Sequence, residues 1–284
     1  MAPITAPTIA VIAPGAMGSA VAARLTRHGV TVLTSLEGRG PKSRARAEAA
    51  GMKDVDDQRL VDDASIILSI VPPAEAAALA ARFAPRLAAA KHAPVFVDCN
   101  AISVSTVMDI GRRFDDIGVR FVDAGIIGGP PKGDDAGPTF YCCGAAAGEL
   151  TGLAAHGLHI RPVDGAIGAA SALKLSYAGI TKGLTAIATA MILAADRAGA
   201  GPALRAELAA SQPQLLARFT KALPEMYPKA YRWVEEMHAI SEFIGEDFAE
   251  SAIFKGAAGL YDRIAADEDG DRAACQRIDA FLAG

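Results

Sequence analysis

The feature that most constrains the fold is a regular alternation of short apolar runs with helical segments in the first half of the chain. The run "TIAVIA" at residues 8–13 is β-branched, and "GAMGSAVAARLTRHG" after it carries apolar residues at helical spacing. This pattern predicts a strand, a tight turn and a helix. Later runs of the strand type are "VTVLTS", "ASIILSIV", "PVFVDCN" and "VRFVDAG". Their alternation with helices favours an α/β fold with a parallel, doubly wound sheet.

The pattern changes at Gly165, after which long helical segments follow without a further convincing strand. A chain of 284 residues is long enough for two domains. We therefore expect a sheet-containing domain over residues 1–164 and an all-helical domain over residues 165–284. The first helix of the second domain is predicted from about residue 166 to about residue 198, and this length suits a helix that joins the two domains.

The turn "APGAMG" at residues 13–18 follows the first predicted strand directly. It has the pattern G-x-G-x-x-G with alanine in the first glycine position. Gly15 lets a pyrophosphate approach the backbone, Gly18 allows the helix to pack closely on the strand, and the helix N-terminus offers amide donors. We therefore predict a dinucleotide site; an ordinary strand-to-helix turn is the alternative. The predicted contacts are Pro14, Gly15, Ala16, Met17 and Gly18.

The end of the second strand bears on which dinucleotide binds. An NAD site usually places an acidic residue there to bind the ribose, whereas this strand ends at Ser35 and is followed by Arg39, Lys42 and Arg44. Ser35 and Arg39 suit the 2'-phosphate of NADP. Two alternatives stay open: Glu37 binds the ribose of NAD, or the basic loop simply faces solvent.

Composition limits the kinds of partner that the protein can bind and the cellular compartment that suits it. Lysine and arginine number 28 against 32 acidic residues, without the interleaved basic and aromatic residues of a nucleic-acid surface. The four cysteines show no C-x-x-C spacing, and the adjacent pair lies in the strand-like run "TFYCCG", which indicates reduced, packed thiols in a cytoplasmic protein. The apolar segment between Lys182 and Asp196 is shorter than the roughly 20 residues that cross a bilayer, so we expect a buried helix and no membrane. His156 and His159 lack an acidic residue at metal spacing, so no metal is expected.

Lys174 lies among small and apolar residues in "GAASALKLSYAGITKG". On a helix it shares one face with Tyr177, Ala178 and Thr181. A lysine there can be structural, with its ammonium reaching solvent past the alkyl stem. Alternatively it is a general acid/base, because burial lowers the pKa of a lysine from about 10.4 towards neutrality.

Several segments together resemble the β-hydroxyacid dehydrogenase and 6-phosphogluconate dehydrogenase superfamily, in order and spacing over nearly the whole chain. They are "VIAPGAMGSAVAARL", "SIVPP", "VFVDCN", "FVDAGIIGGPP" and "GAASALKLSYAGITKG". The resemblance implies a nucleotide-binding Rossmann-type domain followed by an all-helical domain, with Lys174 as the catalytic acid/base. It also implies cofactor contacts at Val71, Pro72 and Asn100. The block "MYPKAYRWVEEMHAISEF" resembles that of a less characterised branch of the superfamily.

The chain departs from the usual family pattern at three places. After the strand ending at Asp98, this chain has Asn100 and Ala101 where the family usually has Ser and Thr. Where the family has Ser-Gly-Gly to hold a substrate carboxylate, this chain has Ile127, Gly128 and Gly129, followed by two prolines without a backbone N–H. Tyr177 stands where the family usually has asparagine. We expect Ile127, Gly128 and Gly129 to line the substrate side, and a substrate that is larger or partly apolar.

These observations predict an NADP-dependent oxidoreductase that interconverts a secondary alcohol and a carbonyl, with Tyr177 orienting the reacting oxygen or sharing its proton. NAD is possible as the cofactor. Imine reduction is one alternative, although imine reductases commonly lack the lysine; a non-catalytic NADPH-binding sensor is another. The long apolar stripes of the helical domain predict a homodimer, and the stripe of Trp233, Met237, Ile240 and Ile244 is either core or subunit interface.

Overall fold

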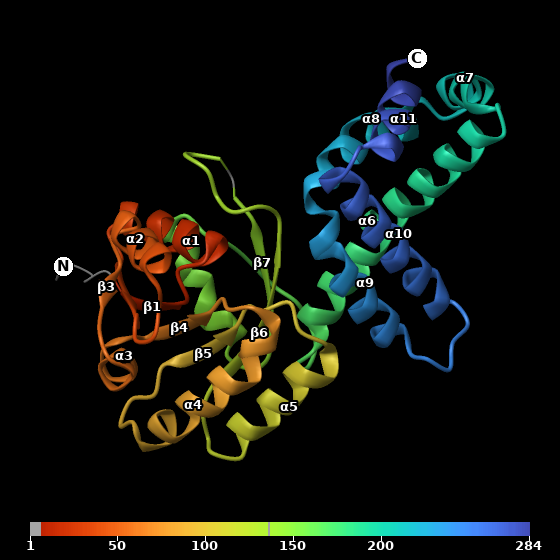
Figure 1. Cartoon of the computed structure of the whole chain (residues 1–284). Helices are drawn as coiled ribbons and strands as arrows, with labels where there is room; N and C mark the ends of the chain where they lie inside the picture. The colour runs from red at the N-terminus through yellow and green to blue at the C-terminus, as the bar shows by residue number, and fades with distance from the viewer. Residues whose placement is uncertain (1–6, 136) are drawn as a thin grey trace. The chain divides into compact units, whose positions relative to one another are not determined.

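The computed structural model describes residues 7–135 and 137–284. The chain forms two compact units, Met1–Lys174, here called the sheet unit, and Leu175–Gly284, here called the helical unit (Figure 1). The division falls inside one helix, α6 (Ala169–Arg197), shortly after the domain boundary expected at residue 164.

The sheet unit is built on one eight-stranded sheet with the order β3-β2-β1-β4-β5-β6-β7-β8. Strands β1 to β6 are parallel, β7 is antiparallel to β6, and β8 is parallel to β7. The predicted fold class is therefore confirmed. The strands are β1 (Thr8–Ile12), β2 (Thr31–Thr34), β3 (Lys53–Asp54), β4 (Ile66–Ser69), β5 (Val95–Asp98), β6 (Phe121–Ile127), β7 (Thr139–Cys143) and β8 (His159–Pro162).

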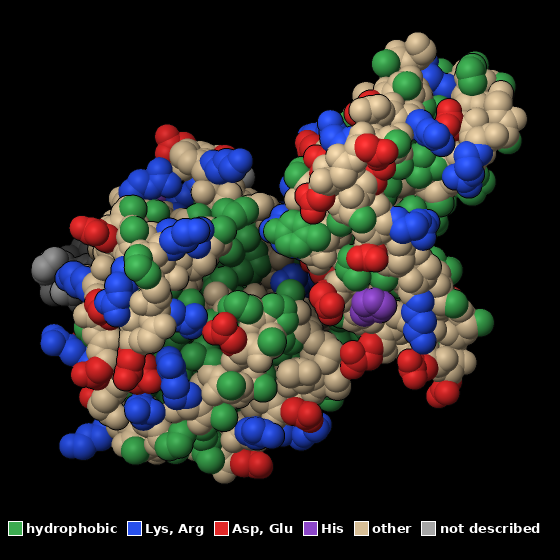
Figure 2. All heavy atoms as spheres, in the orientation of Figure 1, with side chains coloured by type: hydrophobic (Ala, Val, Ile, Leu, Met, Phe, Trp, Pro, Cys, Tyr) green, Lys and Arg blue, Asp and Glu red, His purple; other side chains and the backbone are tan. Residues whose placement is uncertain are grey.

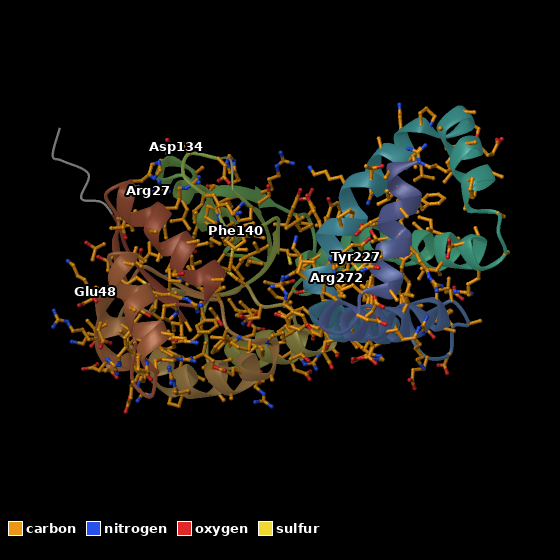
Figure 3. All side chains as sticks on the ribbon, turned by 45° about the horizontal axis from the view of Figure 1, so that its top comes forward. Arg27, Glu48, Asp134, Phe140, Tyr227 and Arg272 are labelled. Carbon is orange, nitrogen blue, oxygen red and sulfur yellow. The ribbon has the colours of Figure 1, made fainter. Side chains whose placement is uncertain are left out.

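Helices cover both faces of this sheet because successive strand residues point to opposite sides. In β1, Ile9 and Val11 join one apolar core, whereas Ala10 and Ile12 join the other. Phe140 of β7 is buried in the first core (Figure 3). The helical segments of the sheet unit are α1 (Ala16–Arg27), α2 (Pro41–Ala49), α3 (Asp57–Asp63), the 3₁₀ turn η1 (Pro73–Glu75), α4 (Ala76–Ala89), α5 (Val104–Asp115) and the 3₁₀ segment η2 (Ala147–His156).

The helical unit packs around its own core. Met237, Ile240 and Tyr261 are buried, and the Trp233 ring meets the Tyr261 ring edge-on with centroids 5.2 Å apart. The apolar stripe that includes Trp233 therefore belongs mainly to the core of this unit. Its helices after α6 are α7 (Gly201–Ser211), α8 (Pro213–Met226), the 3₁₀ turn η3 (Tyr227–Lys229), α9 (Ala230–Ile244), α10 (Ser251–Asp269) and α11 (Ala273–Ala283).

Helix α6 agrees with the predicted helix of residues 166–198 to within a few residues. The expectation that its apolar segment is buried was only partly right. Ile187 and Met191 of that segment are exposed, and 39% of the most apolar stretch of α6 is buried. By length and composition α6 is able to span a bilayer, a test that core helices of water-soluble proteins also pass.

Two strands, β3 and β8, were not predicted from the sequence. Both lie at edges of the sheet and consist mostly of exposed residues, so neither carries the apolar run that marks a buried strand. The four cysteines are free thiols and all are buried, as expected for packed, reduced side chains. Within residues 7–135 and 137–284, no cluster of three histidine, cysteine or acidic side chains is arranged to hold a metal.

Candidate cofactor and catalytic site

The turn after β1 leaves the N-terminus of α1 open to an external anion. Gly15 is the residue that precedes the helix, and a methyl group added to it would meet no atom within 4 Å. A methyl group on Gly18 would lie 2.1 Å from the Ala13 carbonyl oxygen, so glycine is needed there for helix and strand to approach. Helix α1 has no acidic residue in its first turn and no side-chain cap. Its amide donors and positive dipole end are therefore available to a phosphate group.

The turn lies at the topological switch point of the sheet. From β1 the chain moves to β2 and β3 on one side and returns to β4, β5 and β6 on the other. Ligands of such sheets bind in the crevice at the carboxyl ends of the strands on either side of this point. Val71 and Pro72 follow β4 at that edge, and the Ala13 N–H donates to Ile70 O at 3.4 Å. The fold thus brings two of the predicted cofactor-binding segments together.

A hydrogen bond and an ion pair fix the conformation of the loop after β2. Ser35 is buried, Glu37 is exposed, and Arg44 donates from Nη2 to the carbonyl of Leu36 at 2.7 Å. Arg39 Nη2 lies 3.3 Å from Glu75 Oε2, so an ion pair connects the loops that follow β2 and β4. Arg39 therefore stands at the edge where a 2'-phosphate is expected, but its guanidinium already has a carboxylate partner.

The buried side chain of Asn100 connects the loops after β4 and β5 through hydrogen bonds. Its Oδ1 accepts the Val71 N–H at 2.7 Å, and its Nδ2 donates to Ser69 Oγ at 2.9 Å and to Asp98 Oδ2 at 2.8 Å. The residue is 3% exposed. The side chain predicted to contact the cofactor directly is thus engaged within the protein, and it positions Val71.

Lys174 lies on the second turn of α6, near the ends of β5 and β6. The residue as a whole is half-buried, but its amine is desolvated, and this burial lowers the pKa of Lys174 below its ordinary value. The Cys99 thiol and the carboxyls of Asp98 and Asp123 oppose that shift. Because burial raises the pKa of Cys99 well above its usual range, the thiol is neutral near pH 7 and the two carboxyls are the opposing charges.

Asp98 and Asp123 are two buried acidic residues on the strands β5 and β6. They occupy paired positions on neighbouring strands, and each is 1% exposed. Burial raises the pKa of Asp98 to about 6; hydrogen bonds from Asn100 and the charge of Lys174 act against this rise, and Asp123 adds to it. Asp123 was not predicted as a site residue, although an aspartate inside the apolar run "VRFVDAG" was the available signal.

The predicted substrate residues continue along β6 from the point where the strand meets α6. A methyl group on Gly125 would lie 3.2 Å from Lys174 Cβ. Ile127 ends the strand two residues later, roughly 7 Å beyond Gly125, and Gly128 and Gly129 follow it. Gly128 has φ of 124°, and an added methyl would lie 2.9 Å from Pro138 Cα, so glycine is required there.

The loop between β6 and β7 is fastened to α1. Arg24 donates from Nη2 to the Gly133 carbonyl at 3.1 Å and to Asp135 Oδ1 at 3.0 Å, and Arg27 lies 3.8 Å from Asp134 (Figure 3). Helix α1 therefore contributes to both the dinucleotide turn and the support of the predicted substrate loop.

Tyr177 follows Lys174 on α6 by three residues, so the two side chains are neighbours on the helix surface. Its side chain is accessible, because the residue is 54% exposed.

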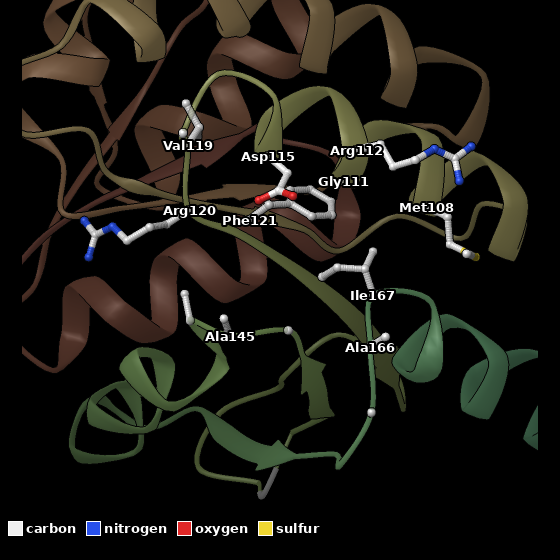
Figure 4. Close-up of a pocket in the computed structure, with 14 residues that line it drawn as sticks. Met108, Gly111, Arg112, Asp115, Val119, Arg120, Phe121, Ala145, Ala166 and Ile167 are labelled. Atoms are coloured by element: carbon white, nitrogen blue, oxygen red, sulfur yellow. The ribbon is translucent and has the colours of Figure 1, made fainter.

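A separate cavity of about 650 Å³ lies at the other end of β6 (Figure 4). Phe121, which begins β6, lines it together with Met108 and Ile167, and Arg112 and Asp115 of α5 are also among its lining residues. None of the residues predicted to bind cofactor or substrate lines this cavity.

Comparison with known proteins identifies the family. Residues 8–153 match the NAD binding domain of 6-phosphogluconate dehydrogenase. The chain belongs to this family. Residues 195–264 match a second family, a domain of unknown function known as DUF1932. The predicted superfamily is therefore confirmed, and so are the nicotinamide dinucleotide cofactor and the class of NAD(P)-dependent dehydrogenases and reductases.

Similar proteins extend over most of the chain. An uncharacterized 28.5 kDa protein of Methanothermus fervidus is 29% identical over 171 residues, which are 60% of this chain and 64% of that protein. The match thus spans less than two thirds of that relative. A conserved protein of unknown function, described as structurally similar to 3-hydroxyacid dehydrogenases, has a TM-score of 0.78 at 26% identity over 95% of this chain and 99% of that one. The 3-hydroxyisobutyrate dehydrogenase of Mycobacterium tuberculosis, solved with L-serine, shares the fold with a TM-score of 0.74 at 19% identity over 98% of each chain.

Proposed function

We propose that the protein is an NADP-dependent oxidoreductase that interconverts a secondary alcohol and a carbonyl, with Lys174 as the general acid/base. The observation that carries this proposal is the desolvated amine of Lys174, held beside two buried carboxyls in a family of NAD-binding proteins. A lysine that only reached solvent would need no such surroundings.

The open end of α1 fits the pyrophosphate of a dinucleotide. The backbone at Gly15 is accessible, and the amides of the first turn of α1 have no internal anion to bind. The nicotinamide ring, when bound, gives or accepts the hydride. Lys174 moves the accompanying proton: its ammonium donates to the carbonyl oxygen during reduction, and its neutral amine removes the hydroxyl proton during oxidation. Burial makes proton loss easier, while Asp98 and Asp123 keep the ammonium form accessible.

Ser35 and Arg39 support NADP over NAD, because a hydroxyl and a guanidinium suit a 2'-phosphate. Binding of the phosphate requires Arg39 to share or leave Glu75. NAD remains the alternative cofactor, with the exposed Glu37 as the ribose ligand.

The substrate side supports a molecule that depends little on a carboxylate anchor. Ile127 offers no polar side chain, and Pro130 and Pro131 offer no N–H after the two glycines. A small hydroxy acid, or a larger and partly apolar alcohol, is the substrate class that we propose, with Tyr177 orienting its oxygen.

Exposed apolar residues on α6 support a homodimer. Ile180, Ile187 and Met191 are 73%, 53% and 58% exposed, and their spacing places them along one stripe of the helix. Burial of this stripe by a second copy is the arrangement that we propose for a cytoplasmic protein. Sedimentation that gives a monomer at micromolar concentration would refute the dimer.

Basic and acidic side chains are mixed over the face seen in Figure 2, which supports the absence of a nucleic-acid partner.

A side-by-side screen tests the function. Alcohols with NADP⁺, and carbonyls and imines with NADPH, are followed by absorbance of the reduced cofactor. We expect turnover with at least one alcohol and carbonyl pair. Turnover of imines alone would favour an imine reductase, and tight NADPH binding without any turnover would favour a sensor.

A further inference from the structure

We propose that Asp123 is a positioning residue for Lys174, because its carboxyl fastens the first turn of α6 to strand β6 and so fixes where the lysine amine lies. This inference rests on the proposed function of Lys174. It assigns a role to a residue that is not among the predicted cofactor, substrate or catalytic residues.

The contacts of Asp123 converge on the start of α6 and its neighbouring strand. Its Oδ2 accepts the backbone N–H groups of Gly168 and Ser171 at 3.0 Å and 3.1 Å, and its Oδ1 accepts the Ser171 hydroxyl at 2.7 Å. The Cys143 thiol of β7 donates to Oδ2 at 3.3 Å, and Cys143 Sγ in turn accepts the Ala170 N–H at 3.2 Å. The carboxyl therefore occupies the positive end of the helix and satisfies amides that have no partner within it.

Gly125 sets the distance between the strand and the same helix. It lies two residues after Asp123, so both residues face α6 from the same side of β6. A methyl group on Gly125 would lie 2.7 Å from the Ala170 carbonyl oxygen and 3.2 Å from Lys174 Cβ. Asp123 thus holds the first turn of α6 while Gly125 allows the next turn, with Lys174, to contact the strand.

Asp123 also contributes charge to the surroundings of Lys174. The groups that face the lysine are Cys99 and Asp98 from the β5 end and Asp123 from β6. The Cys99 thiol is neutral near pH 7, so the two carboxyls are the charges that oppose the lowering of the Lys174 pKa by burial. Removal of the Asp123 charge destabilises the ammonium form, so the Lys174 pKa falls further. A residue that only stabilised the fold would leave this titration unchanged.

The Asp123→Asn variant removes the negative charge of the side chain and keeps its size and most of its hydrogen bonds. An asparagine oxygen can accept the two backbone N–H groups, and its amide can donate to the Ser171 hydroxyl, so the helix start keeps most of its hydrogen bonds. Asp57→Asn is the matched control, because Asp57 is a buried acid of the same unit that pairs with Arg82 at 3.2 Å, outside the group of charges at Lys174. Gly125→Ala tests position without changing charge, and Gly148→Ala is its control, because a methyl group there meets nothing within 4 Å.

The decisive measurement is an NMR titration of the Lys174 amine in the whole protein, with the signal assigned by its loss in Lys174→Met. We expect a lower Lys174 pKa in Asp123→Asn and an unchanged one in Asp57→Asn. In parallel, the rise of alcohol oxidation with pH should move to lower pH in Asp123→Asn. Gly125→Ala should lower kcat by up to about 10²-fold with little change in NADPH affinity, because a displaced acid/base loses alignment.

The outcomes distinguish this inference from the proposed function. An unchanged Lys174 pKa in Asp123→Asn, or normal kcat in Gly125→Ala, overturns the positioning role even if Lys174→Met is inactive. Full activity of Lys174→Met overturns the catalytic role of the lysine, whatever Asp123→Asn does to its pKa. If Asp123→Asn does not fold, Ser171→Ala is the replacement variant, because it removes a single hydrogen bond to Asp123. Normal kcat in both Ser171→Ala and Gly125→Ala then overturns the inference.

Discussion

The N-termini of α1 and α6 both lie close to a strand, but only the N-terminus of α6 is occupied by an acidic side chain of the protein. Both α1 and α6 approach a strand through a glycine: a methyl on Gly18 would lie 2.1 Å from Ala13 O, and one on Gly125 would lie 2.7 Å from Ala170 O. The end of α1 has no internal acid, whereas the end of α6 is occupied by Asp123. An open helix end can bind an external anion, and a closed one can hold a side chain of the protein in place.

The strongest way to break this comparison is a pair of glycine substitutions at the turn after β1. We expect Gly18→Ala to lose about 1–3 kcal/mol of unfolding free energy, because its methyl group meets backbone. Gly15→Ala should change stability by less than about 0.5 kcal/mol and yet weaken NADPH binding, because its methyl group faces the open helix end. Chemical denaturation and fluorescence titration measure the two effects. Equal stability losses, or unchanged NADPH affinity in Gly15→Ala, would argue against an anion site at α1.

A second prediction sharpens the assignment of the anion. Arg39→Ala should weaken NADPH binding by about 1.5–3 kcal/mol as a charge-assisted contact is lost, and should leave NADH binding nearly unchanged. Glu75→Gln is the companion variant, because it frees Arg39 from its ion pair and should strengthen NADPH binding. Calorimetry with both cofactors measures these affinities. Equal affinities for NADPH and NADH in the unchanged protein would point to Glu37 as a ribose ligand.

The smallest expected effect concerns the neighbour of Lys174 on α6. Tyr177→Phe should lower kcat roughly tenfold if the hydroxyl only orients the reacting oxygen. Its thermal midpoint should stay unchanged, because the residue is 54% exposed. Steady-state kinetics and thermal unfolding test this. An inactive Tyr177→Phe beside a merely slowed Lys174→Met would make the tyrosine the proton donor.

Local patterns predicted the parts of the fold that depend on local physics. The buried strands β1, β2, β4, β5 and β6 carry apolar runs, and α6 lies in the long helical segment predicted after residue 165. The edge strands β3 and β8 lack such runs because solvent covers them. Their existence depends on pairing with neighbours.

The candidate site was predicted only in part, for a related reason. The turn at residues 13–18 is a local sequence pattern, and the resemblance to the superfamily pointed to Lys174. Asp123, by contrast, caps a helix that begins more than forty residues later, so its role depends on a tertiary contact. Asn100 was predicted at the cofactor edge. Its hydrogen bonds to Ser69 and Val71, at the end of β4, were not predicted because these residues lie far from it in the sequence.

The most direct test of the account compares two lysines of the same helix. Lys174→Met keeps the alkyl stem and removes the amine, while Lys182→Met is the control, because Lys182 is bonded to Glu236 and lies over the Trp233 ring with its amine 4.8 Å from the centroid. We predict that Lys174→Met lowers kcat by about 10²–10⁴-fold with NADPH affinity and thermal midpoint nearly unchanged, and that Lys182→Met loses stability instead. Full turnover by Lys174→Met, on a substrate that the unchanged protein converts, would contradict the account.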